Sequence, residues 1–177
     1  MRERQASEAA EARRAREFEA FVAGAAGRLL HAATLLTAEP PDDNPRARRL
    51  LTLSLASTYA SWDRLHGEDP YDRTRRHLVL RFADGAWPWY GRRRPGRRSV
   101  RFRPPDAPAA PAALSALTPR QRLVVVLRLF EGVAEEQTAA LLGLPADRVR
   151  ALCARATADL LRPPRGRAPA AVGAARS

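Results

Sequence analysis

The sequence predicts an all-α protein with two small helical domains, joined by an Arg-rich and Pro/Ala-rich linker. Apolar residues recur at i, i+3, i+4 and i+7 in several segments, and this spacing places them on one face of a helix. Residues typical of helix starts precede these segments, and glycine follows several of them. Amphipathic helices joined by short loops are typical of helical bundles.

Residues 1–16 consist largely of Ala, Glu and Arg, which favour a helix but give it no apolar face. We therefore expect this N-terminal segment to be frayed or disordered. A helix is expected from Glu17, because an apolar stripe runs from there to Leu36. Pro40 and Pro41 then interrupt the pattern.

Two more helices are expected before the chain becomes strongly basic. Asn44 followed by Pro45 is a helix start, and the buried side of this second helix is predicted to hold Leu51, Leu55, Thr58 and Trp62. Asp69 and Pro70 open a third helix that ends near Gly85, and its apolar face comprises Tyr71, Thr74, Leu78 and Phe82. Three such helices imply a compact helical domain.

The segment from Arg81 to Arg103 combines arginines with aromatic side chains. Bases stack on aromatic rings while guanidiniums follow phosphates, so this composition suits single-stranded or distorted nucleic acid. The candidate DNA-binding residues here are Trp87, Trp89, Arg92, Arg93 and Arg94. The alternative is a basic linker whose tryptophans pack against the helical domain.

Two segments are too rich in Pro and Ala to form a core. Residues 104–113 are predicted to be an extended linker of the polyproline II type. Residues 163–177 contain mainly Pro, Arg, Ala and Gly and are expected to be disordered. The remaining chain divides into a helical domain with a basic extension at 17–103 and a second helical domain at 114–162.

The second domain is predicted to be a helix-turn-helix module. Thr118 and Gln121 form a Thr-x-x-Gln capping box, and the helix that they open ends at Gly132. A short second helix is expected at 135–142, with two acids in its first turn and Gly143 as its left-handed C-cap. A short helix, a glycine turn and a basic helix in this order are typical of the motif.

The third helix of this module, expected to start near Pro145, divides its residues between two faces. The buried face is predicted to hold Val149, Leu152, Cys153, Ala156 and Leu160. On the opposite side, small residues flanked by arginines permit close approach to a major groove. The candidate DNA-binding residues on this helix are Arg148, Arg150, Ala151, Ala154 and Arg155. The alternative is a solvated arginine-bearing helix of an ordinary bundle.

Composition favours a nucleic-acid partner. The chain has 177 residues, and its 31 basic side chains, all Arg, exceed its 19 acids, which gives a net charge of +12. Such a charge favours a polyanion, and nucleic acid ranks before a membrane because no long apolar run is evident. With no visible signal peptide and one cysteine, the expected location is the cytoplasm.

Catalytic and metal chemistry find no support in the sequence. His31, His66 and His77 lack metal-ligand spacing, and Cys153 falls on the buried side of its helix. Phosphate-binding loops, nucleophile elbows and paired-carboxylate signatures are missing. We therefore expect no catalytic residue, no metal and no cofactor.

The stretch LTPRQRLVVVLRLFEGVAEEQTAALLGLPADRVRALCARA resembles the fourth conserved region of bacterial sigma factors of the extracytoplasmic-function type, within the sigma-70 superfamily. The resemblance implies that this module binds the upstream, minus-35 promoter element. Val149 and Arg150 keep the buried anchor and the cation of the family's recognition helix. The chain departs from the family at Pro145, Asp147, Ala134 and Thr138.

The N-terminal half is similar to the second conserved region of the same family, through the segments FEAFV, LLHAATLL, SLASTYASWDRL and YDRTRRHLVLRF. That region binds the polymerase clamp helices and melts the minus-10 element, which implies polymerase contacts at Arg48, Leu51 and Leu55. The family usually has acidic and amide groups where this chain has residues 45–50, with three arginines. Gly85 and Pro88 also break the last helix earlier than is usual.

The sequence thus predicts a sigma-like transcription initiation factor whose partners are promoter DNA, core RNA polymerase and an anti-sigma factor, with no membrane. Two alternatives remain open. One is a degenerate sigma-like regulator that binds DNA without productively recruiting polymerase. The other is a helical interaction protein whose basic segments are merely solvated.

Overall fold

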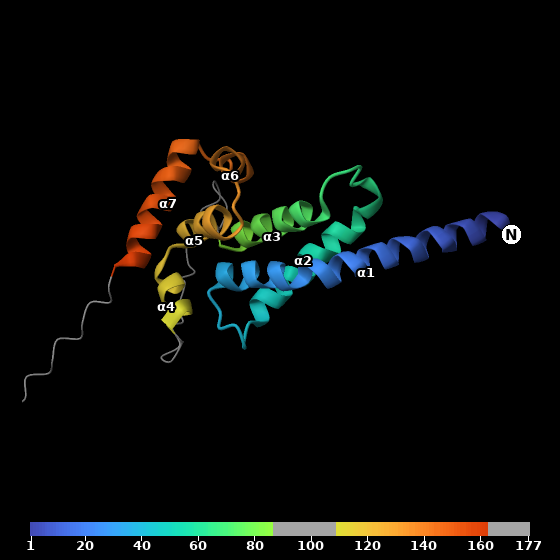
Figure 1. Ribbon diagram of the computed structural model, residues 1–177, viewed down its shortest axis with the longest axis horizontal. Coiled ribbons are helices and arrows are strands. Elements are labelled where there is room, and N and C mark those ends of the chain that lie inside the picture. The colour runs from blue at the N-terminus through green and yellow to red at the C-terminus, as the bar shows by residue number, and fades with distance from the viewer. Residues whose placement is uncertain (87–108, 163–177) are drawn as a thin grey trace, which may run out of the picture.

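A computed structural model of the chain describes residues 1–86 and 109–162 (Figure 1). Every regular element in these residues is helical, which confirms the predicted all-α class. The N-terminal helices are α1 (Arg2–Thr37), α2 (Pro45–Ala60), the short η1 (Trp62–Arg64) and α3 (Pro70–Ala86). The C-terminal helices are α4 (Ala109–Ala116), α5 (Pro119–Val125), η2 (Val126–Phe130), α6 (Glu135–Leu142) and α7 (Ala146–Leu161).

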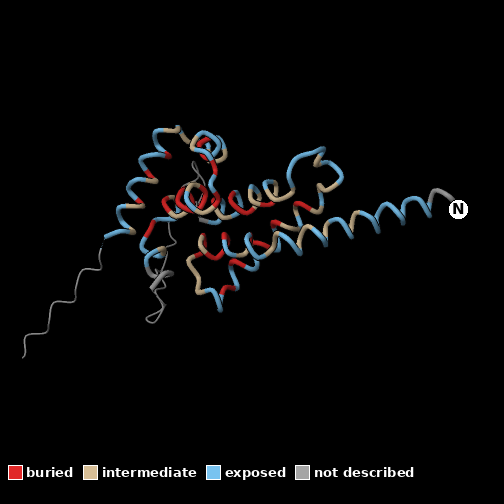
Figure 2. The backbone as a smooth tube through the Cα atoms, in the orientation of Figure 1, coloured by how far each residue is buried: buried red, intermediate tan, exposed pale blue. Residues whose placement is uncertain are grey.

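Helix α1 is longer than predicted, because it begins at Arg2 and includes the segment expected to be frayed or disordered. Its N-terminal half projects from the body of the protein, and Figure 2 shows it almost wholly exposed. The helical propensity of Ala, Glu and Arg accounts for a helix without an apolar face. An aromatic cluster packs the next two turns of α1 against α2 and η1. Phe18 lies 4.8 Å from Tyr59 and 5.2 Å from Trp62 between ring centroids.

Contrary to the expectation of no long apolar run, α1 is long and apolar enough to cross a membrane by length and composition alone, over Arg4–Thr37. The apolar residues of its C-terminal half are instead the centre of the protein core, among them Leu29, Ala33 and Leu36. Of that apolar window, 33% is buried, so packing in the core accounts for part of this hydropathy.

The N-terminus of α2 is capped by a residue other than the one at its N-cap position. Asn44 occupies the N-cap position, but its amide donates to Thr34 Oγ1 and to the Pro41 carbonyl, and its carbonyl accepts from Arg48. Glu39 supplies the cap in its place, because its carboxylate accepts from the backbone N–H groups of residues 46 and 47 at 3.1 and 2.8 Å. A carboxylate there also complements the positive end of the α2 dipole.

Helices α2 and α3 meet through polar as well as apolar contacts. The buried hydroxyls of Thr58 and Thr74 lie 2.9 Å apart, and each also lies within hydrogen-bond distance of a carbonyl one turn earlier in its own helix. Since each hydroxyl has one proton, one of them donates to the other, which in turn donates to its carbonyl. Because both hydroxyls are satisfied, they join the two helices without leaving a buried polar atom unpaired.

The predicted linker at 104–113 is helical in its second half. Residues 104–108 lie outside the described residues, whereas α4 begins at Ala109 and contains the rest. Pro111 falls in the first turn of α4, where a missing backbone N–H costs no helical hydrogen bond. Alanine propensity therefore prevails over an extended linker conformation from this point.

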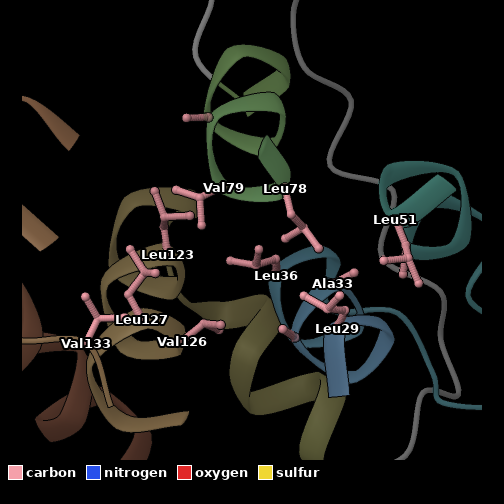
Figure 3. Close-up of a cluster of buried hydrophobic side chains, with 13 residues drawn as sticks. Leu29, Ala33, Leu36, Leu51, Leu78, Val79, Leu123, Val126, Leu127 and Val133 are labelled. Atoms are coloured by element: carbon pink, nitrogen blue, oxygen red, sulfur yellow. The ribbon is translucent and has the colours of Figure 1, made fainter. Parts of the chain in front are cut away.

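One hydrophobic core connects the N-terminal helices with the C-terminal ones (Figure 3). Leu123, Val126, Leu127 and Val133 from α5, η2 and the turn after η2 belong to the same cluster as Leu29, Leu36, Leu78 and Val79 from α1 and α3. Leu127 and Val149 are both buried, but they belong to different clusters. Leu127 is buried toward α1 and α3, and Val149 belongs to a separate cluster with Val124.

Candidate nucleic-acid interface

The capping box at the start of α5 is present as predicted. The Thr118 hydroxyl accepts from the Gln121 backbone N–H at 3.3 Å, and the Gln121 side chain accepts from the Thr118 backbone N–H at 2.9 Å. The same Gln121 side chain donates to Asp159 at 3.1 Å. The cap thus fixes both the start of α5 and the position of the last turns of α7.

The turn between α6 and α7 depends on a glycine. Helix α6 occupies the predicted range Glu135–Leu142, and Gly143 follows it with φ of +62°, in the left-handed region. The backbone N–H of Leu144 donates to the Ala139 carbonyl at 3.0 Å, which closes the end of α6. A residue with a Cβ would be strained at this φ, so the glycine sets where α7 begins.

The predicted helical phase of α7 is confirmed by burial. Val149, Leu152 and Ala156 are buried, and they pack with residues of α5 and α6, among them Val124, Val125 and Ala139. Cys153 is half-buried against the same core. Since this face is fixed on α5 and α6, the opposite face of α7 is left to solvent (Figure 2).

All five candidate residues of α7 lie on this exposed side: Arg148, Arg150, Ala151, Ala154 and Arg155. The three alanines at 151, 154 and 158 are exposed as well, so the middle of this face carries only small side chains. Guanidiniums beside a low surface are positioned to reach phosphates or guanine edges when the helix enters a major groove.

Arg150 is held by an ion pair that sequence reasoning did not predict. Its Nη2 lies 2.6 Å from Oε1 of Glu135, and its Nε lies 3.3 Å from Oε2. The Glu135 side chain is 14% exposed, whereas that of Arg150 is 71% exposed. The carboxylate thus anchors the inner edge of the guanidinium, and the outer donors remain accessible.

Thr138, one of the departures from the family pattern, is fully buried in α6. Within the described residues, its hydroxyl has no hydrogen-bond partner. A buried unsatisfied hydroxyl destabilises a fold relative to an apolar side chain of the same shape.

The remaining candidates fall in two places. Trp87, Trp89, Arg92, Arg93 and Arg94 lie outside the described residues. Of the residues expected to contact polymerase, Arg48 is exposed, Leu51 is buried in the core and Leu55 packs against that core. The two leucines therefore fix α2 to its neighbours, and Arg48 is the one of the three that is open to a partner.

The three histidines do not form a cluster. The His31 ring lies tilted against Phe130, with 4.9 Å between ring centroids. Burial lowers the pKa of His77, assisted by the nearby Arg73. Among the residues that the structure describes, no group of three or more His, Cys, Asp or Glu side chains could hold a metal ion.

Comparison with known proteins points to one family. The family model described as "Sigma-70, region 4" matches residues 113–160, which cover the helix-turn-helix module. The chain is 31% identical over 155 residues to the RNA polymerase sigma-E factor of Streptomyces coelicolor, a match that spans 81% of this chain and 83% of that protein. The factor of the same name from Streptomyces avermitilis is also 31% identical, over 81% of this chain and 82% of its own length. No solved structure gives a significant match.

Proposed function

The chain belongs to the extracytoplasmic-function type of RNA polymerase sigma factors, within the sigma-70 superfamily, and from that membership we propose that α7 reads the upstream, minus-35 promoter element. Its role is that of a non-catalytic, DNA-binding transcription initiation factor. The observation that carries the proposal is the exposed face of α7, where alanines lie between Arg148, Arg150 and Arg155. A low surface between guanidiniums matches the requirements of major-groove reading.

The same family membership indicates which part of the chain contacts which partner. Residues 114–162 are proposed as the upstream reader, and residues 17–103 as the part that docks on core RNA polymerase and engages the downstream, minus-10 element. Exposed Arg48 and Arg49 at the start of α2 are the proposed rim of the polymerase contact. Trp87, Trp89 and Arg92 to Arg94 remain proposed contacts to the melted strand. An anti-sigma factor is a further proposed partner, and the proposed location is the cytoplasm.

Run-off transcription with purified core polymerase tests the initiation role directly. The expected result is a discrete transcript that depends on this protein and on an intact upstream element. DNA binding without a transcript would favour the degenerate regulator, for which the acid-poor start of α2 is the relevant observation. Failure of the chain to bind any promoter DNA would favour the helical interaction protein instead.

A further inference from the structure

The arginines within α7 differ in whether an acid neutralises them. Arg150 Nη2 lies 2.6 Å from Glu135 Oε1, and Arg150 Nε lies 3.3 Å from Glu135 Oε2. Arg148 and Arg155 are exposed, and no acidic side chain within residues 1–86 and 109–162 forms an ion pair with either of them. The helix thus presents one guanidinium inside a neutral ion pair and two others that keep their full positive charge.

These two kinds of arginine lie on opposite edges of the exposed face. At 100° per residue, Arg148 and Arg155 fall on one edge and Arg150 falls on the other, with Ala151 and Ala154 between them. Arg148 and Arg155 are about two turns apart, which is roughly 10 Å along the helix axis. Arg150 lies near the start of α7, beside α6 (Figure 1). In helix-turn-helix modules, the N-terminal residues of the recognition helix contact the base edges.

The ion pair changes what Arg150 can bind well. An arginine binds a phosphate largely through its net charge, which displaces counterions from the DNA. The Glu135 carboxylate cancels most of that attraction and adds its own repulsion of the phosphate. Hydrogen bonding to a base depends instead on the planar geometry of the guanidinium donors, which the pair leaves intact. Arg150 is therefore a poor phosphate contact that remains suited to a base.

The donors left open on Arg150 favour one base. Of the five N–H donors of a guanidinium, Glu135 engages one on Nε and one on Nη2. The edge formed by Nη1 and Nη2 stays open, and the Arg150 side chain is 71% exposed. Two parallel donors match two adjacent acceptors, and in the major groove guanine presents such a pair at O6 and N7. Adenine places an acceptor beside a donor there, so the open edge selects guanine.

Glu135 is itself held in place by the contact between α6 and α7. Its side chain is 14% exposed in the first turn of α6, where a carboxylate complements the helix dipole. Ala139 of α6 packs with Val149 and Leu152 of α7 in the same buried cluster. Ion pairs with an exposed partner contribute little to folding stability. Orienting Arg150 is therefore the main effect of this pair.

We propose that Glu135 is a positioning residue that dedicates Arg150 to a guanine of the upstream element, while Arg148 and Arg155 contact the phosphates along the other edge of α7. This inference rests on the proposed function, because it requires α7 to enter a major groove. It adds the identity of one base and assigns different roles to arginines on one helix. Glu135 does not touch the DNA in this arrangement and acts through Arg150.

The test compares Arg150→Ala with Arg148→Ala in the full chain, since both remove one charge from an exposed position of α7. Selection from a randomised duplex library gives the base preferences, and titrations at several salt concentrations give the salt slope. Arg150→Ala should lower the preference for guanine at one position by roughly tenfold, with little change in slope. Arg148→Ala should keep that preference and make the slope shallower by about one. Equal effects of the two variants, or the reverse pattern, would overturn the assignment.

A modified base tests the guanine contact directly. In 7-deazaguanine a carbon replaces N7, so one of the two acceptors is lost while pairing with cytosine is kept. At the selected position it should weaken binding of the unmodified chain by roughly tenfold and leave binding of Arg150→Ala unchanged. Arg150→Lys should behave like Arg150→Ala, because an ammonium cannot offer two parallel donors in one plane. Indifference of the unmodified chain to this base would overturn the guanine assignment.

The positioning role is tested by Glu135→Gln beside Glu136→Gln, which changes the net charge equally at an exposed neighbouring position. Glu135→Gln leaves Arg150 as a full cation, so the guanine preference should fall and the salt slope should become steeper by about one. Glu136→Gln should do neither. Added to Arg150→Ala, Glu135→Gln should leave the base preference as it is in the single variant. A further change of preference in that double variant would show that Glu135 does not act through Arg150.

A failure of the proposed function would give a different pattern. If Arg148→Ala, Arg150→Ala and Arg155→Ala all bind the selected duplex as the unmodified chain does, α7 is not the DNA reader, and both proposals fall. If Arg148→Ala and Arg150→Ala lose the same affinity on every sequence, α7 still lies on the DNA, and the separate role of Arg150 falls alone.

Discussion

Arg150 of α7 and Glu135 of α6 join the two helices of the turn through a two-point ion pair, so a predicted DNA-contacting side chain is ordered before DNA arrives. Arginine loses much rotamer freedom when it binds a base edge, and an existing contact on its inner edge removes part of that cost. The pair therefore makes Arg150 the best candidate for base reading on this helix.

Replacing Arg150 by Ala should weaken specific DNA binding by about 1–3 kcal/mol and relax preference at one position of the site. Fluorescence anisotropy with promoter and scrambled duplexes at several salt concentrations measures both effects. Arg162→Ala removes the same charge from the end of α7 and serves as the control. An equal loss on all sequences, with a salt slope lower by about one, would identify Arg150 as a phosphate contact instead.

Glu135→Gln should strengthen non-specific DNA binding and lower the selectivity for promoter DNA. It removes a negative charge near the proposed phosphate path, so affinity for scrambled DNA should rise. It also releases Arg150, so the ratio of promoter to scrambled affinity should fall. Glu136→Gln, at the exposed neighbouring position, changes the net charge equally and controls for it. Identical behaviour of the two variants would show that Glu135 does not position Arg150.

Thr138→Val should stabilise the full chain by about 1 kcal/mol, because it replaces a buried hydroxyl that has no partner among the described residues with a methyl group of similar size. Thr58→Val is the matched control and should destabilise, since the Thr58 hydroxyl bonds to Thr74 and to the Ser54 carbonyl. Thermal unfolding followed by circular dichroism measures both. A lower melting temperature for Thr138→Val would mean that its hydroxyl has a partner in solution.

Val149→Ala and Leu127→Ala should both destabilise the full chain, by about 1–4 kcal/mol through lost transfer energy and the cavity left behind. The two variants should differ in which helices are destabilised. Val149 packs within the helix-turn-helix module, whereas Leu127 belongs to the core shared with α1 and α3. Leu127→Ala should therefore raise hydrogen exchange in the last turns of α1 as well, and Val149→Ala should not. Equal exchange in both variants would contradict this division.

Local signals predicted the helices except α4 and the N-terminal part of α1, and long-range contacts could not be predicted from the sequence. Proline and capping residues fixed the starts of α2, α3 and α5, and Gly143 fixed the end of α6, because these signals act within a few residues. The phase of α7 followed from its 3.6-residue period. Glu131 gave no comparable signal, since its partners Tyr71 and Arg75 lie 60 and 56 residues away in the chain. The replacement of Asn44 by Glu39 as the cap of α2 likewise depends on the path of a loop.

The surface at the start of α2 leads to the last prediction. Arg48 and Arg49 are exposed there, where the family usually presents acidic and amide groups to polymerase. The Arg48 side chain is directed in part by Asn44, which accepts from its Nε at 2.9 Å. If the polymerase surface is basic, an arginine in place of an acid replaces an attraction by a repulsion. Each such contact weakens the binding free energy by about 1 kcal/mol or more.

The double reversal Arg48→Glu with Arg49→Glu should therefore strengthen binding to core polymerase, with a larger gain at low salt, where surface charges are least screened. A core-binding titration compares it with the reversal of Arg13 and Arg16, which lie exposed on the projecting half of α1 and give the same change of net charge. The competing account assigns the required acids to Asp42, Asp43 and Asp63. Of these, Asp63 is already paired with Arg14 at 3.0 Å, whereas Asp42 and Asp43 are exposed beside α2. Weaker binding by the Arg48 and Arg49 reversal than by its control would show that the arginines contribute to docking, and the acids at 42 and 43 would then be the groups to test.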